Sequence, residues 1–177
     1  MIIRLAKPSD AADMTALLNE IIAAGGTTAH QRPFDDQRMQ TEYIAPEMNI
    51  ACHVAEIDGR VAGFQSLVRP GPETNSELVG WAYIATFVAQ DVAGKGVGQH
   101  LFAATRASAQ AAGVETIDAT IRADNVPGLR YYSGLGFQDY DRLNDVPLRD
   151  GTRIDRLRKR YDLPQGDDPE KSKLAQL

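Results

Sequence analysis

The sequence predicts an α/β protein with a mixed β-sheet, and three observations support this fold class. Apolar segments of strand length alternate with segments in which apolar residues recur every three or four positions, as on the buried face of a helix. The turn Asp58-Gly59 joins two apolar-rich runs, which indicates a β-hairpin. The run at residues 78–89 is long and continuously apolar, which is typical of a central strand covered on both faces.

The N-terminal half is expected to contribute three strands and two helices to this fold. The strands are expected at residues 2–6, 51–57 and 60–68. Ser9 or Asp10 is the expected N-cap of the first helix, which ends at the glycine pair 25–26. A second helix, at about 35–44, follows the polar loop 27–34.

The C-terminal half continues the alternation of helices and strands. Strands are expected at residues 78–89, 114–121, 137–143 and 153–161. One helix runs from Gly96 to the stop at Gly113, and a shorter one has Asn125 as its expected N-cap. We expect residues 1–163 to form one domain and the charged segment 164–177 to be a mobile tail.

Composition narrows the function classes. Of the 177 residues, 43% are apolar and 24% charged, as in a globular domain, and no run approaches the roughly 20 apolar residues of a membrane span. The N-terminus has too few apolar residues for a signal peptide, and a single cysteine excludes an internal disulfide, so we expect a cytoplasmic protein. The net charge of -5 argues against nucleic acid and favours a cationic substrate such as an amine.

A glycine-rich turn, VAQDVAGKGVG at residues 88–98, joins the central strand to the next helix. Its glycines permit positive φ values and close approach of a ligand to the backbone. Because a helix start presents unpaired N–H groups and partial positive charge, the turn is a natural phosphate site. Spacing excludes two familiar phosphate loops: the dinucleotide fingerprint needs glycine at Gln99 or Leu101, and the ATP/GTP loop needs serine or threonine at Gly96.

Two motifs resemble those of the GNAT superfamily of acyl-CoA N-acyltransferases. The turn is similar to the family's pyrophosphate loop, although Gln90 replaces the usual proline and Ala93 the usual arginine or glutamine. The matching positions are Val88, Gly96 and Gly98. The segment NVPGLRYYSGLGF at 125–137 is similar to a later helix and turn of the family. The matching positions there are Asn125, Tyr132, Gly136 and Phe137.

The resemblance implies a GNAT fold, in which a mixed sheet of six to seven strands is splayed at its centre and flanked by about four helices. It also implies an acetyl-CoA-dependent N-acetyltransferase that acts directly on a primary amine of a small molecule, amino-acid-like or otherwise. A protein or peptide N-acetyltransferase is one alternative. A non-catalytic acyl-CoA-binding module is another. A homodimer is compatible with the family.

The resemblance places the cofactor's diphosphate on backbone amides of the glycine-rich turn and its pantetheine arm beside the end of the central strand. The expected cofactor-binding residues are Phe87, Val88, Gly94, Lys95, Gly96, Val97, Gly98, Gln99 and Asn125. Asn125 is expected to hydrogen-bond the pantetheine arm. We expect no metal.

Acyl transfer from a thioester to an amine needs an acid for the leaving thiolate, donors for the oxyanion and loss of a proton from the amine. Tyr132 is the expected acid, because a phenol with a pKa of about 10 can protonate a thiolate whose thiol titrates near about 8.5. Tyr131 is the alternative. The backbone N–H of Val88 or its neighbour is expected to stabilise the oxyanion.

The base and the acceptor site are less well defined by the sequence. Relatives often carry a basic carboxylate on the central strand, but the corresponding positions are Ala82 and Tyr83. The remaining candidates for the base are Glu77, Glu56, His30 and solvent. Thr28, His30 and Tyr83 are the candidates for acceptor binding. The basic run at 153–161 is interpreted as a solvated strand face.

Overall fold

A computed structural model describes residues 1–72 and 78–164 and confirms the α/β class. Within these residues, the strands are β1 (Ile2–Leu5), β2 (Asn49–Ile57), β3 (Arg60–Val68), β4 (Trp81–Val88), β5 (Thr116–Arg122), β6 (Gln138–Pro147) and β7 (Arg153–Asp162). The α-helices are α1 (Ala11–Ala24), α2 (Asp36–Met39), α3 (Val97–Ala111) and α4 (Val126–Gly134). Glu77 and the tail from residue 165 lie outside the described residues.

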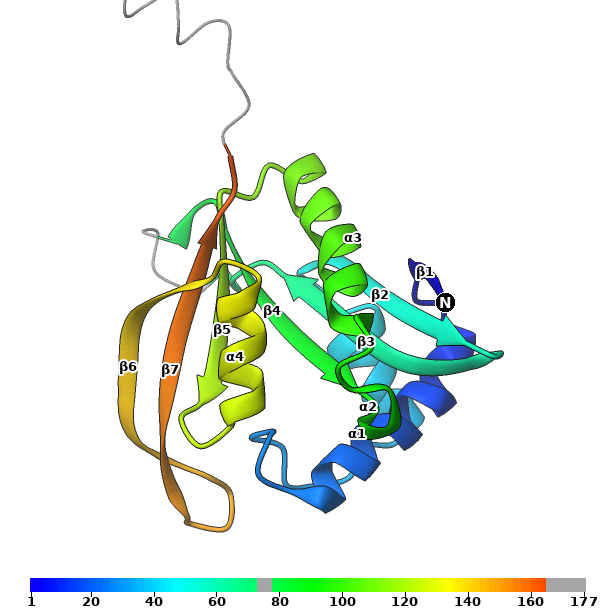
Figure 1. Cartoon of the computed structure of the whole chain (residues 1–177), viewed down its shortest axis with the longest axis horizontal. Coiled ribbons are helices and arrows are strands. Elements are labelled where there is room, and N and C mark those ends of the chain that lie inside the picture. Colours follow the sequence, from blue (N-terminus) through cyan, green and yellow to red (C-terminus); the bar gives the residue numbers. More distant parts are fainter. Residues whose placement is uncertain (73–77, 165–177) are drawn as a thin grey trace, which may run out of the picture.

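The strands form one mixed sheet in the order β1-β2-β3-β4-β5-β7-β6. Neighbouring strands are antiparallel except for β4 and β5, which are parallel. These two strands pair only where Trp81–Tyr83 meets Thr116–Asp118, whereas β5 stays paired with β7 along its whole length. Beyond Tyr83 the two strands therefore diverge, and the predicted central splay is confirmed (Figure 1).

The start of the central strand and the way in which Asp10 caps α1 differ from the prediction for local reasons. The central strand begins at Trp81 rather than residue 78, because Gly80 has a φ of 85° and its carbonyl accepts hydrogen bonds from the start of β5. Asp10 precedes α1 but does not cap it through its side chain. Its carboxylate instead accepts from the Lys7 N–H at 2.7 Å and pairs with Arg4, which ties α1 to β1.

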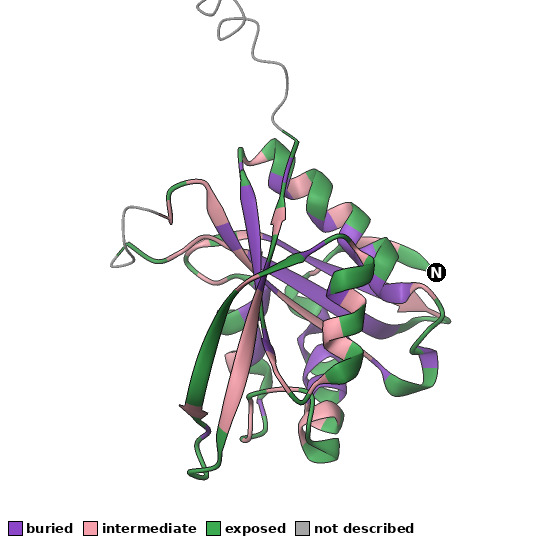
Figure 2. Cartoon of the chain, turned by 60° about the vertical axis from the view of Figure 1, so that its left-hand side comes forward, coloured by how far each residue is buried: buried purple, intermediate pink, exposed green. Residues whose placement is uncertain are grey.

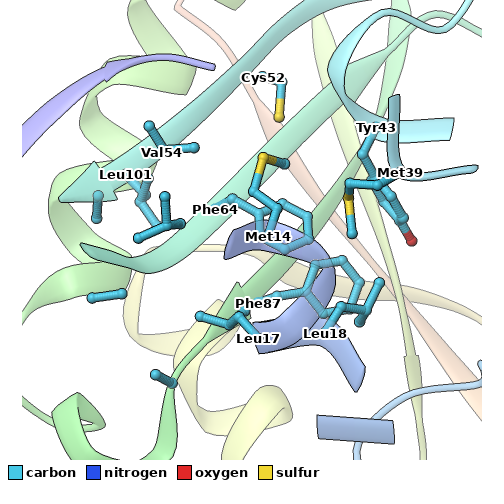
Figure 3. Close-up of a cluster of buried hydrophobic side chains, with 14 of the residues drawn as sticks. Met14, Leu17, Leu18, Met39, Tyr43, Cys52, Val54, Phe64, Phe87 and Leu101 are labelled. Carbon is cyan, nitrogen blue, oxygen red and sulfur yellow. The ribbon is translucent and has the colours of Figure 1, made fainter. Parts of the chain in front are cut away.

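The helices cover both faces of the sheet, with α1 and α2 on one and α3 and α4 on the other (Figure 1). Alternation along β4 shows this division, because Phe87 packs against Tyr43 beside α2 while Thr86 faces Tyr132 on α4. Burial is concentrated in the central strands, and β6 is mostly exposed (Figure 2). The core on the α1 side gathers Met14, Leu18, Met39, Phe64 and Phe87 (Figure 3).

In the part of the chain that the structure describes, the helices are too short or too polar to span a lipid bilayer.

Candidate active site

A cavity of about 750 Å³ occupies the opening between β4 and β5. The cavity is lined by the ends of β4 and β5, the glycine-rich turn with the start of α3, the first turns of α4, and residues 27–30 of the loop after α1, with further contributions from Ile21, Tyr43 and Arg156. In Figure 1 this loop lies beyond the point where β4 and β5 diverge. Two motifs that are about 27 residues apart in the sequence thus meet at one cavity with a third, unrelated segment.

The edge of β4 that faces the cavity has unpaired backbone groups. Toward β3, Ala89 N–H donates to Ala62 at 2.9 Å, and toward β5 the Gly80 carbonyl accepts from Glu115 at 2.7 Å. Because these directions alternate along a strand, the N–H and C=O groups of Thr86 and Val88 point into the gap where β5 has diverged. The Val88 N–H therefore points into the cavity, which is compatible with the oxyanion role predicted for it.

The glycine-rich turn takes the conformation that its glycines permit. Gly94 and Gly96 have φ values of 77° and 82°, and Gly96 is the N-cap of α3 in the left-handed region. The predicted cofactor residues that line the cavity are Phe87, Val88, Gly94, Gly96, Val97, Gly98, Gln99 and Asn125. Lys95 is not among the lining residues. The first-turn N–H groups of α3 form a main-chain cradle suited to an anion, even though Ala93 supplies no polar side chain.

Gly98 is needed for a different reason from the other two glycines. A Cβ at this position would lie 2.6 Å from Cε2 of Tyr131, so only glycine lets the tyrosine ring pack against α3. The Tyr131 hydroxyl donates to the Gly98 carbonyl at 2.8 Å. Its single proton is committed to this bond, which makes Tyr131 an anchor between α4 and α3 rather than an acid.

Tyr132 lies at the cavity wall with its hydroxyl 2.9 Å from the Thr86 hydroxyl. Gln65, on β3, donates through Nε2 to Thr86 at 2.8 Å and to Tyr131 at 3.2 Å. Thr86 accepts from Gln65 and keeps its own proton, which it can donate to the Tyr132 oxygen. In this arrangement the Tyr132 proton is available to a group in the cavity.

Burial raises the pKa of Tyr132 well above its usual value of 10, so the phenol is protonated at neutral pH. The hydrogen bond from Thr86 acts in the opposite direction, because it stabilises the phenolate. Burial also raises the pKa of Tyr131, to about 12. Sequence reasoning missed Gln65 and Thr86, since neither lies in the two motifs.

Asn125 is confirmed as the N-cap of α4, where its Oδ1 accepts from the Gly128 N–H at 2.9 Å. Its Nδ2 donates to the Thr27 carbonyl at 2.9 Å. Nearby, Arg122 donates to the Thr28 carbonyl at 3.0 Å. The side chain predicted to bind pantetheine is thus engaged in fastening residues 27–28 across the open end of the cavity.

His30 and Thr28 line the cavity, but Tyr83 does not. Tyr83 lies deeper in the sheet, opposite Asp118 of β5 in the closed part of the β4–β5 pair. His30 Nε2 lies 2.7 Å from the Tyr43 hydroxyl, and burial lowers the pKa of His30 below 6.5. Of the proposed carboxylate bases that the structure describes, Glu56 is paired with Arg4 on β1 and does not line the cavity. Among the candidate bases that the structure describes, His30 is therefore the one that reaches the cavity.

The sequence suggested that the basic run at 153–161 is a solvated strand face, and this interpretation is wrong. Lys159 is only 5% exposed and pairs with Asp139, and Arg158 pairs with the buried Asp118.

Arg156 lines the cavity. Among the described lining residues, the charged side chains are arginines at 122, 130 and 156 and none is acidic, which is opposite to the net charge of the chain.

Comparisons with known proteins agree on one family. The model of the acetyltransferase (GNAT) family matches residues 15–137. YwnH of Bacillus subtilis (strain 168), named for a proposed phosphinothricin acetyltransferase activity, is 26% identical over 160 residues, which cover 88% of this chain and 94% of the relative.

Two solved structures have the same fold. YncA from Salmonella typhimurium, a proposed acetyltransferase solved with its cofactor acetyl-CoA, superposes with a TM-score of 0.80 at 22% identity and covers 95% of this chain and 96% of its own. A crystal structure described as a proposed phosphinothricin N-acetyltransferase gives a TM-score of 0.77 at 25% identity, with coverage of 93% and 99%.

Proposed function

Because the chain belongs to the GNAT family of acetyltransferases, we propose that it transfers an acetyl group from acetyl-CoA directly to a primary amine of a small molecule. The observation that carries the proposal is the position of Tyr132. Its hydroxyl is hydrogen-bonded to Thr86 at the wall of a cavity that is also lined by the start of α3, where free N–H groups suit an anion. A donor for the leaving thiolate and a cradle for a diphosphate therefore border the same space.

The unpaired edge of β4 and the start of α3 fit the two ends of acetyl-CoA. The N–H groups of Gly94 and of residues 96–99 would hold the diphosphate, whereas the Lys95 N–H is bonded to the Val92 carbonyl; Arg130 on α4 also lines this cavity. The N–H and C=O groups of Thr86 and the C=O of Val88 would pair with the pantetheine amides in the manner of an added strand, which leaves the Val88 N–H for the thioester oxygen. The thioester would then lie beside Tyr132.

This chain's residues would divide the chemistry among them. The Val88 N–H would donate to the oxyanion as the amine attacks the thioester carbonyl. Tyr132 would protonate the departing sulfur, with Thr86 stabilising the resulting phenolate. His30, neutral at pH 7 because burial lowers its pKa, would accept the proton of the amine directly or through water.

The fastened loop at residues 27–28 supports a small acceptor. Its carbonyls are held by Asn125 and Arg122, so the loop closes over the end of the cavity at which an amine would enter. A protein acceptor would have to displace these bonds. The resemblance to proteins named for phosphinothricin acetylation supports an amino-acid-like amine.

The test is thiol release from acetyl-CoA over a panel of amino acids, simple amines and peptides, with acetyl-CoA binding followed by thermal shift. Cys52 is buried, and burial raises its pKa to about 12, so the protein contributes little background. We expect the wild-type protein to release thiol with a small amine. Tyr132→Phe should reduce this rate roughly ten- to a thousandfold and still bind acetyl-CoA. Binding without release would indicate a non-catalytic module, and release with peptides alone would indicate a protein acetyltransferase.

A further inference from the structure

Arg156 differs from the other arginines of its strand. Three arginines of β7 are paired with carboxylates: Arg153 with Asp145, Arg158 with Asp118, and Arg160 with Asp162. Arg156 forms no ion pair among the described residues, and its Nε is buried without a hydrogen-bond partner. A buried donor that lacks a partner costs free energy, and a ligand that pairs with it recovers that cost.

Strand alternation shows which end of the cavity Arg156 serves. Ile121 of β5 packs in the core cluster beneath α3 and α4, so its neighbour Arg122 points to the opposite face. Arg156 lies directly across from Arg122 in the β5–β7 register and shares that face. The face is that of residues 27–30, because Arg122 donates to Thr28 there. Arg156 therefore belongs to the end of the cavity beside His30, away from the glycine-rich turn.

No side chain among the described residues that line the cavity neutralises the charge of Arg156. Arg122 is neutralised by Asp124, and burial keeps His30 largely neutral at pH 7. No acidic side chain is present among the described residues that line the cavity. The Arg156 guanidinium would repel a group that is only cationic, whereas its planar set of N–H donors could bind an anion.

We propose that Arg156 binds an anionic group of the acceptor, which makes the acceptor an amine with a free carboxylate, as in an amino acid. This inference rests on the proposed function and specifies its substrate class. It replaces the expectation of a simply cationic substrate drawn from the net charge. The guanidinium would hold the carboxylate while the neutral amine meets the thioester beside His30 and Tyr132.

Ligand-observed NMR tests the proposal without depending on turnover. The probes are L-amino acids and phosphinothricin, each amino acid matched with its carboxamide, added to the protein with and without coenzyme A. We expect acids to bind and amides to bind at least tenfold more weakly. In Arg156→Gln the acids should lose about ten- to a hundredfold in affinity, and Arg156→Lys should recover part of it.

Arg160→Gln is the matched control, because Arg160 lies on the same strand, is exposed and pairs with Asp162. It should leave binding unchanged. Equal binding of acids and amides, retention of acid binding in Arg156→Gln, or failure of every acid to bind would each overturn the proposal. Where turnover is measurable, Arg156→Gln should raise KM for the acceptor with kcat and KM for acetyl-CoA little changed. Acid-selective binding without any thiol release would refute catalysis while leaving the Arg156 site supported.

Discussion

The hydroxyls of Thr86 on β4 and Tyr132 on α4 are hydrogen-bonded at 2.9 Å across the opening in the sheet. Gln65 donates to Thr86, which leaves the Thr86 proton free to be donated to the Tyr132 oxygen. This hydrogen bond joins β4 to α4 through Tyr132, the residue that would protonate the leaving thiolate. Thr86 is thus a positioning residue for Tyr132.

Thr86→Val should reduce kcat roughly tenfold, because the isosteric side chain removes the donor that stabilises the Tyr132 phenolate. KM for acetyl-CoA should change little. Steady-state kinetics with the best acceptor of the panel is the measurement, and Thr86→Ser, which restores a hydroxyl, should recover most of the rate. An unaltered kcat in Thr86→Val would show that Tyr132 does not depend on this bond.

Gly98→Ala should destabilise the protein by about 1–3 kcal/mol, because the added Cβ overlaps the Tyr131 ring. Urea unfolding measures this loss, and removal of the ring in Gly98→Ala/Tyr131→Ala should make the two changes less costly together than their sum. Gly134→Ala is the control: a Cβ at this position would meet nothing within 4 Å, so alanine in that helix should be neutral or stabilising. Equal effects at both glycines would contradict the packing argument.

His30 should determine the acidic limb of the pH–rate profile. Burial lowers its pKa below 6.5, so the neutral form persists at pH 7 and kcat/KM should fall only at lower pH. His30→Gln should remove this limb and lower the rate near pH 7. Tyr43→Phe, which removes the hydroxyl 2.7 Å from Nε2, should shift the limb. A profile that is identical in the wild type and His30→Gln would leave solvent as the base.

Protein stability should fall as pH decreases through the range below about 6.5. Burial lowers the pKa values of His30 and His53 in the folded state, so the unfolded chain binds protons first and gains free energy from them. Asp10 has a pKa lowered by Arg4, and its contribution is lost only below about 3.8. Urea unfolding at pH 7.5, 6 and 5 measures the histidine effect, and a flat dependence over that range would refute it.

Two substitutions of Asn125 distinguish its role as the cap of α4 from its role in holding Thr27. Asn125→Ala should cost about 1 kcal/mol, because the cap of α4 is lost, and should raise the acceptor KM because Thr27 is released. Asn125→Asp keeps an oxygen for the Gly128 N–H, so it should retain stability but still release the loop. A rise in KM for acetyl-CoA alone, in both variants, would instead support contact with the pantetheine arm.

Features that are local in the chain could be predicted from the amino-acid sequence. Glycines at 94 and 96 adopt positive φ, Asn125 caps the following helix, and a continuous apolar run marks β4 as central, so the fold and the conformation of the glycine-rich turn were predictable. These properties depend on backbone conformation and on spacing of a few residues.

The meeting of side chains at the cavity depends on the three-dimensional fold. Gln65 lies 21 residues from Thr86, and Thr86 lies 46 residues from Tyr132, so no local sequence pattern predicts the hydrogen bonds between them. The special position of Arg156 also depends on the fold. In the sequence it belongs to a basic run that reads as solvated, whereas in the structure the other arginines of β7 pair with carboxylates and Arg156 does not. Composition suggested a cationic substrate because it sums the whole surface, whereas binding depends on the few charges that line the cavity.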